Sequence, residues 1–67
     1  MKMIVNGREV QLPESVITVR DLLEHFQLNK ELAIVELNQS ILDKAERDGA
    51  KLSNGDRVEI VQFVGGG

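Results

Sequence analysis

Residues 18–28, TVRDLLEHFQL, constrain the fold more than any other segment, because they have the spacing of one amphipathic helix. The apolar residues occupy positions i, i+3, i+4 and i+7, which form one face of a helix: Val19, Leu22, Leu23 and Phe26. Thr18 is a suitable N-cap, and Asp21 follows three residues later, as in a capping box. Pro13 lies outside this segment, where it cannot break a helix. We predict one helix over residues 18–28, with an apolar face that must be buried.

The segment before this helix has the pattern of a β-hairpin. Asn6-Gly7 tolerates the positive φ angles of a tight primed turn, and Val10 and Leu12 alternate with polar neighbours. Residues 2–12 therefore predict two antiparallel strands. A loop between two unrelated strands is the alternative reading.

The segments after the helix also have strand patterns. Residues 32–35 are four consecutive apolar residues, typical of a central strand, and residues 41–42 predict a short returning strand. The polar residues 43–51 predict a loop with a helical turn. A tight turn at 54–56 precedes a last strand that includes residues 59–64. This order predicts an α+β fold, in which a mixed sheet of four to five strands packs on one main helix.

Composition excludes several classes of function. A chain of 67 residues forms one domain with a thin core, and it has no room for a deep catalytic cleft, so we do not expect an enzyme. The net charge is −3 and the aromatic residues are Phe26 and Phe63, which argues against nucleic-acid binding. No stretch has the length of a signal peptide or a membrane span. We expect a cytoplasmic protein that does not bind membranes.

Side chains that could support catalysis or bind a metal are few. Cysteine is absent and His25 is the only histidine, so no thiolate site, metal cluster or catalytic triad is indicated. His25 falls on the polar side of the predicted helix, where a solvated surface residue is expected. Carboxylate pairs such as Glu31 with Glu36 would need a cleft to shift their pKa values usefully, and we interpret them as solvated charges.

The predicted sheet leaves apolar side chains on the face turned away from the helix. If Val58 and Ile60 face the helix, Val61 and Phe63 project from the opposite face. Ile4 on the first strand would join them, and a contiguous exposed apolar patch is typical of a docking surface. The alternatives are a β-bulge that reverses the alternation and a loop that covers these residues.

Gly65, Gly66 and Gly67 close the sequence. Glycine has no Cβ, so such a backbone can enter a slot that any side chain would block. We expect residues 65–67 to form a flexible tail after a domain at residues 1–64, and we expect the α-carboxyl group of Gly67 to be ionised. A carboxylate becomes reactive when a partner enzyme converts it to an acyl adenylate. A frayed end or a leftover linker is the alternative interpretation of the glycines.

The whole chain resembles the ubiquitin-like β-grasp sulfur carriers, and most closely the ThiS family of the thiamine pathway. The order of hairpin, helix and strand carries this resemblance, together with LSNGDRVEIV and the closing QFVGGG. It implies that the first and last strands are parallel neighbours at the centre of the sheet. It also implies that Gly67 is the reactive residue and that Gly66, with Gly65, lines the threading arm.

The resemblance further implies a set of partners. An adenylating enzyme would use ATP and Mg²⁺ to activate Gly67, and sulfur, from cysteine through a desulfurase, would convert it to a thiocarboxylate for thiazole synthase. Two alternatives stay open. The related molybdopterin carriers commonly have prolines before their closing glycines, whereas this chain has only Pro13. A β-grasp interaction module with an incidental glycine tail is the other alternative.

Overall fold

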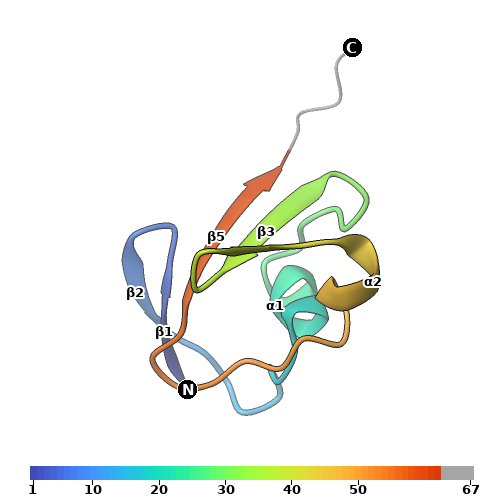
Figure 1. The fold of residues 1–67 in the computed structure, drawn as a ribbon. Coiled ribbons are helices and arrows are strands. Elements are labelled where there is room, and N and C mark those ends of the chain that lie inside the picture. Colours follow the sequence, from blue (N-terminus) through green and yellow to red (C-terminus); the bar gives the residue numbers. More distant parts are fainter. Residues whose placement is uncertain (63–67) are drawn as a thin grey trace.

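The computed structural model describes residues 1–62 of the chain. The elements of this part, shown in Figure 1, are β1 (Lys2–Val5), β2 (Arg8–Gln11), α1 (Val19–His25), β3 (Ala33–Leu37), β4 (Ser40–Leu42), α2 (Lys44–Arg47) and β5 (Arg57–Gln62). The predicted continuation of the last strand through 63 and 64, and the flexible tail predicted at 65–67, lie outside the described residues.

The strands form one mixed sheet in the order β2-β1-β5-β3-β4. β1 and β5 are parallel, whereas the β1–β2, β3–β4 and β3–β5 pairs are antiparallel. The helix α1 lies against one face of this sheet (Figure 1). The predicted α+β arrangement is therefore confirmed, as is the expectation that the first and last strands are parallel neighbours. β5 is the middle strand, so it is hydrogen-bonded to β1 on one side and to β3 on the other.

Two tight turns close the two hairpins. Asn6 has φ 50° and Gly7 has φ 82°, while Asn38 and Gln39, between β3 and β4, have φ 49° and 72°. Two successive positive φ angles are the signature of the primed turn whose twist matches antiparallel strands. The hairpin predicted for residues 2–12 and the short returning strand at 41–42 are confirmed.

The helix α1 begins as predicted. The Thr18 hydroxyl accepts a hydrogen bond from the Asp21 N–H at 3.2 Å, and Asp21 Oδ2 accepts one from the Thr18 N–H at 3.0 Å, which completes the capping box. Asp21 Oδ2 also accepts the Ile17 N–H at 3.0 Å. Hydrogen bonds from the backbone N–H groups of Ile17 and Thr18 lower the pKa of the Asp21 carboxyl group below its usual value.

The helix ends earlier than predicted, at His25 rather than at residue 28. Gln27 adopts a positive φ of 59°, its N–H donates to the Glu24 carbonyl, and the Leu28 N–H donates to the Leu23 carbonyl. These bonds form a Schellman motif, which usually has glycine at the left-handed position. Phe26 therefore lies past the end of the helix and is 38% exposed, so its predicted place on the buried face is wrong.

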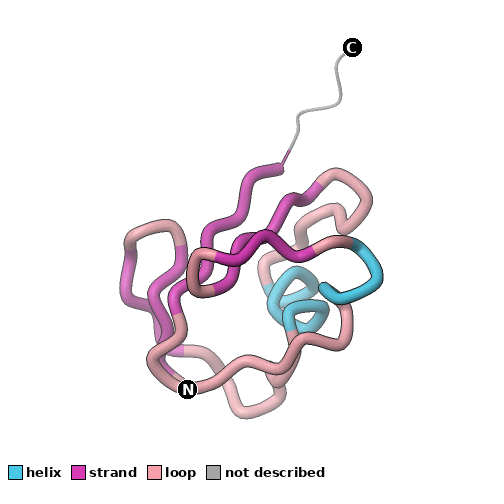
Figure 2. The backbone as a smooth tube through the Cα atoms, viewed as in Figure 1, coloured by secondary structure: helices cyan, strands magenta, loops and turns pink. Residues whose placement is uncertain are grey.

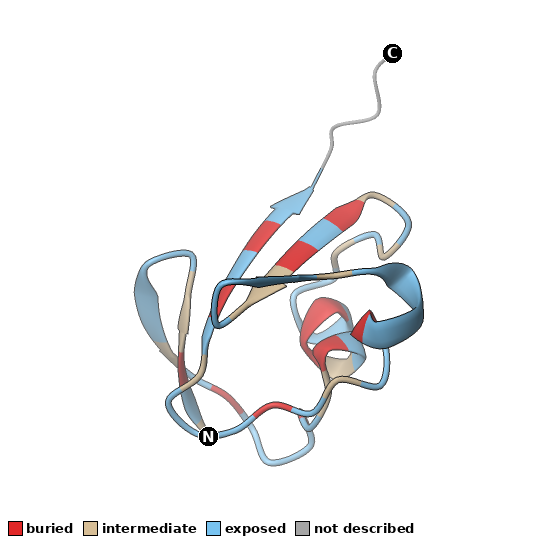
Figure 3. Cartoon of the chain, in the orientation of Figure 1, coloured by how far each residue is buried: buried red, intermediate tan, exposed pale blue. Residues whose placement is uncertain are grey.

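The core lies between α1 and the face of the sheet that α1 covers (Figure 3). Alternate residues of the strands supply one side and α1 supplies the other. The buried apolar residues are Met3, Leu12, Val16, Val19, Leu22, Leu23, Ala33, Val35, Leu52, Val58 and Ile60.

Two long connections close the lower end of the molecule (Figure 2). The segment after α2 lies beside the segment that precedes α1, because Thr18 and Lys51 form an isolated antiparallel bridge. The Val19 N–H donates to the Ala50 carbonyl, and the Leu52 N–H donates to the Ile17 carbonyl, at 2.9 and 2.8 Å. The connections therefore satisfy each other's backbone groups without a further strand.

Candidate functional site at the end of β5

β5 ends at Gln62, the last described residue, which Phe63 and Val64 separate from the three glycines in the sequence, and Gln62 is held from two directions. In the antiparallel ladder Gln62 is opposite Ala33 at the start of β3. The Gln62 side chain reaches the loop after α1, where Oε1 accepts the Asn29 N–H at 2.9 Å. The end of β5 at Gln62 is thus attached to both β3 and the loop that follows the helix.

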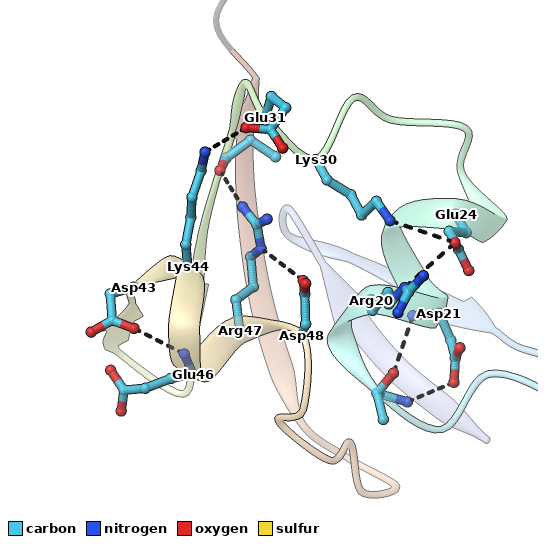
Figure 4. Close-up of polar contacts among 12 residues, drawn as sticks. Arg20, Asp21, Glu24, Lys30, Glu31, Asp43, Lys44, Glu46, Arg47 and Asp48 are labelled. Carbon is cyan, nitrogen blue, oxygen red and sulfur yellow. Dashed lines mark hydrogen bonds and ion pairs between the residues drawn. The ribbon is translucent and has the colours of Figure 1, made fainter.

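Arg47, a residue of the predicted polar loop, supports the same end of the sheet. It is only 4% exposed, its Nη1 donates to the Ala33 carbonyl at 3.0 Å, and its Nε lies 3.5 Å from Asp48 Oδ1 (Figure 4). Ala33 is the residue opposite Gln62. The short helix α2 therefore fastens the beginning of β3 through a buried cation, in a segment that the sequence predicted only as a polar loop with a helical turn.

An exposed ion pair lies above this buried arginine. Lys44 on α2 contacts Glu31 in the loop before β3 (Figure 4). The hydrogen bond and charge of Lys44 lower the pKa of the Glu31 carboxyl group. Both side chains are largely exposed, where ion pairs contribute little to stability.

The face of the sheet turned away from α1, here called the open face, carries the predicted docking residue Val61. Val61 is 58% exposed and is paired with Ile34 of β3, which is 42% exposed. The predicted outward orientation of Val61 is confirmed. Phe63, the second predicted docking residue, lies outside the described residues.

Ile4, the third predicted docking residue, is not beside Val61. Ile4 is paired with Arg57 at the opposite end of β5, four residues before Val61, which corresponds to about 13 Å along a strand. Ile4 is also half-buried rather than exposed. The prediction that Ile4 and Val61 lie together is wrong, because the parallel register brings β1 only to the beginning of β5.

Sequence reasoning missed the apolar partner that Val61 does have. Ile34 belongs to the run of four apolar residues that predicts a central strand. In the structure Ile34 is exposed, whereas its neighbours Ala33 and Val35 point to the other face and are buried. The glutamates at 36 and 59 are opposite each other on the same face. Ile34 and Val61 are here called the apolar pair. On the open face the apolar pair therefore lies next to the pair of glutamates, Glu36 and Glu59.

A groove of about 570 Å³ opens beside the end of β5. It is bounded by the β1–β2 hairpin, the residues after α1 and the last residues of β5. Its lining consists of Val5, Asn6, Arg8, Val10, Phe26, Leu28, Ile60 and Gln62. Phe26 reaches this groove because α1 ends before it.

The remaining candidates do not form a site in the described part of the chain. His25 is exposed, as predicted, with its ring 5.1 Å from the ring of Phe26. Within residues 1–62 no group of three or more histidine, cysteine, aspartate or glutamate side chains could hold a metal ion. No helix among these residues is long and apolar enough to cross a membrane.

Comparison with known proteins shows which proteins share this arrangement. A family model described as ThiS family matches residues 2–67. The sulfur carrier protein ThiS of Bacillus subtilis is 40% identical over 63 residues, which cover 94% of this chain and 96% of that protein. A thiazole synthase of Paramagnetospirillum magneticum is 36% identical over 67 residues, which cover all of this chain and 20% of that protein.

Solved structures agree with these sequence matches. The crystal structure of the thiamine biosynthesis protein ThiS from Geobacter metallireducens has a TM-score of 0.82 and 32% identity, and the match covers 100% of both chains. The predicted ubiquitin-like β-grasp fold is confirmed by this likeness. Because the family match extends from the first strand through all three glycines, the chain belongs to the ThiS family.

Proposed function

We propose that this protein is a sulfur carrier of thiamine biosynthesis and that Gly67 carries the sulfur. A partner enzyme adenylates the Gly67 carboxylate with ATP and Mg²⁺ and releases pyrophosphate. A desulfurase persulfide then displaces AMP to give an acyl disulfide, which a thiol reductant cleaves to the thiocarboxylate. The protein is a substrate of these reactions and not their catalyst. The observation that carries this proposal is the family match through residue 67, together with 40% identity to a sulfur carrier.

The chemistry of the glycines supports the proposal. Adenylation requires that a carboxylate reach a nucleotide inside another protein. Gly65 and Gly66 present no Cβ to the walls of a narrow channel, so they suit the backbone that precedes the reactive residue. The contacts of Gln62 described above hold the chain three residues before Gly65 in the sequence.

Two partners follow from the proposed chemistry, and a third supplies sulfur. The adenylating enzyme acts first, a cysteine desulfurase provides the sulfur, and thiazole synthase receives it. A segment similar to this whole chain forms part of a protein named thiazole synthase, which supports that enzyme as the acceptor. We place the reaction in the cytoplasm, where ATP is abundant.

The apolar pair is our candidate for partner contact, joined by Phe63 if the strand alternation continues. Ile34 and Val61 are exposed and adjacent, Val61 precedes Gly65 by four residues in the sequence, and such apolar surface is the kind that transient interfaces use. Ile4 remains a candidate for a separate contact near the beginning of β5. The carrier must leave each partner after the reaction, so an interface at the small end of the range is expected.

Intact-mass spectrometry tests the proposal. The protein is incubated with a ThiS-adenylating enzyme, ATP, Mg²⁺, a desulfurase, cysteine and an excess of a thiol reductant. We expect a mass gain equal to the replacement of one oxygen by one sulfur, and we expect no gain when one alanine is appended after Gly67. A gain that persists in the appended protein, or no gain in the wild type, would show that Gly67 is not the sulfur-bearing residue.

The acceptor is tested separately, because a carrier for molybdopterin would pass the first experiment. The thiocarboxylated protein is offered to thiazole synthase or to the large subunit of molybdopterin synthase. We expect loss of the added sulfur only with thiazole synthase. Transfer to the other enzyme alone would assign the chain to the molybdopterin pathway.

A further inference from the structure

The parallel pairing of β1 with β5 stops before β5 ends. The Ile4 N–H donates to the Asp56 carbonyl at 3.0 Å, and the Asn6 N–H donates to the Val58 carbonyl at 2.9 Å. If β1 continued with the same step of two residues, the N–H of residue 8 would donate to the Ile60 carbonyl, and the Asn6 carbonyl would accept the Ile60 N–H. The chain instead turns at Asn6-Gly7 into β2.

The side chain of Asn6 fills both of these missing positions. Its Oδ1 accepts the Ile60 N–H at 2.7 Å, and its Nδ2 donates to the Ile60 carbonyl at 3.2 Å. One primary amide has the donor and the acceptor of a peptide unit, so Asn6 replaces the strand that is absent. It extends the support of β5 from Val58 to Ile60.

This support is placed where the strand would otherwise have only one neighbour. Beyond Ile60, β5 has β3 on one side and the groove beside Asn6 on the other. An edge with unpaired backbone groups opens more readily than a strand paired on both sides. Among the described residues Ile60 is the last that is buried, and Val61 and Gln62 after it are exposed.

We propose that Asn6 is a positioning residue for the carrier reaction. Its amide fixes Ile60 and thereby the last described residues of β5, Val61 and Gln62, and the adenylating partner recognises this end of the sheet. This inference rests on the proposed function, because its effect on the reaction is measured with the adenylating enzyme. The support that Asn6 gives to Ile60 can be measured without any partner. A purely local role for Asn6, as a residue that tolerates the positive φ of the turn, is the competing explanation.

A matched pair of substitutions separates the two explanations. Asn6→Gly keeps a turn, since Gly-Gly also forms primed turns, but removes the amide from Ile60. Asn38→Gly is the control: Asn38 has nearly the same φ and also binds β5 through its side chain, where Oδ1 accepts the Arg57 N–H at 3.0 Å. It acts at the beginning of β5, away from the glycines.

Two measurements are made on each variant. Amide hydrogen exchange followed by NMR reports the protection of the Ile60 N–H. ATP–pyrophosphate exchange with the adenylating enzyme, at varied carrier concentration, reports KM and kcat. For Asn6→Gly we expect faster exchange at Ile60 and a KM raised about fivefold to tenfold, the scale of one net hydrogen bond, with kcat little changed. For Asn38→Gly we expect KM to remain at the wild-type value.

A third variant keeps the test sharp if loss of a side chain in the turn unfolds the protein. Asn6→Asp retains a turn-forming residue, but a second acceptor then faces the Ile60 carbonyl in place of the donor. It should also raise KM. Equal KM values for the wild type and both Asn6 variants would overturn the inference. Failure of the wild type to be adenylated would instead refute the proposed function. In that case the hydrogen-exchange rate of the Ile60 N–H would still show whether Asn6 supports Ile60.

Discussion

The two faces of the sheet are built from alternate residues of the same strands, yet they serve different purposes. On the face covered by α1, Met3, Val35 and Val58 are fully buried. On the open face, Ile34 and Val61 form an exposed apolar pair, next to two glutamates. Apolar side chains thus contribute to stability on one face, while on the other they are free to contact a partner. The position of α1 makes this distinction, because hydropathy is similar for both sets.

The largest expected effect is the removal of a side chain from the covered face. Met3 is 0% exposed, so Met3→Ala leaves a cavity and should lower the free energy of unfolding by about 2–5 kcal/mol. Ile4→Ala, one residue later and on the open face, is the control and should lower it less. Urea denaturation of both variants measures the difference. Equal losses would mean that the open face contributes to stability as much as the core does.

The next effect concerns the helix that creates the covered face. Thr18→Ala removes the hydroxyl that accepts the Asp21 N–H and should lower the free energy of unfolding by about 1 kcal/mol. Thr18→Ser retains the hydroxyl and should stay close to the wild type. Thermal unfolding followed by circular dichroism measures both. A serine variant as unstable as the alanine variant would assign the loss to the missing methyl group.

A smaller effect of opposite sign is expected from the glutamates on the open face. Glu59 is directly opposite Glu36 in the antiparallel ladder, and like charges in this arrangement repel. Glu59→Gln should raise the free energy of unfolding by roughly 0.2–1 kcal/mol, and the gain should shrink as salt screens the charges. Denaturation at low and high ionic strength checks this. A gain independent of salt would rule out charge repulsion as its cause.

The smallest effect on stability, with the clearest effect on binding, is expected at Val61. Val61→Thr keeps a β-branched side chain that suits a strand but places a hydroxyl group in the apolar pair. We expect the free energy of unfolding to change by less than about 0.5 kcal/mol and the affinity for the adenylating enzyme to fall. Ile41→Thr on β4, where Ile41 is 71% exposed, is the control. Calorimetric titration measures the affinity of both variants for the adenylating enzyme. An equal loss of affinity in the two variants would show that the apolar pair is not part of the interface.

Local sequence determined most elements of this fold. Asn6-Gly7 specifies a primed turn through its own backbone preferences, and Thr18 with Asp21 specifies the start of α1 through contacts three residues apart. Alternation along β5 placed Val61 on the outside. These features depend on neighbours within one turn or one strand, so the sequence contains their whole physical cause.

Other features were decided only when distant segments met. α1 ends at His25 and is followed by Gln27 in the left-handed conformation, although no glycine marks the place. The buried Arg47 donates to the carbonyl of Ala33, which lies 14 residues away in the sequence. The register between β1 and β5 separates Ile4 from Val61 and brings Asn6 to Ile60. Register is set by the packing of the whole core, because a shift would expose buried side chains. A residue's neighbours across the sheet therefore follow from the tertiary structure, whereas its tendency to turn, cap or alternate is already present in the sequence.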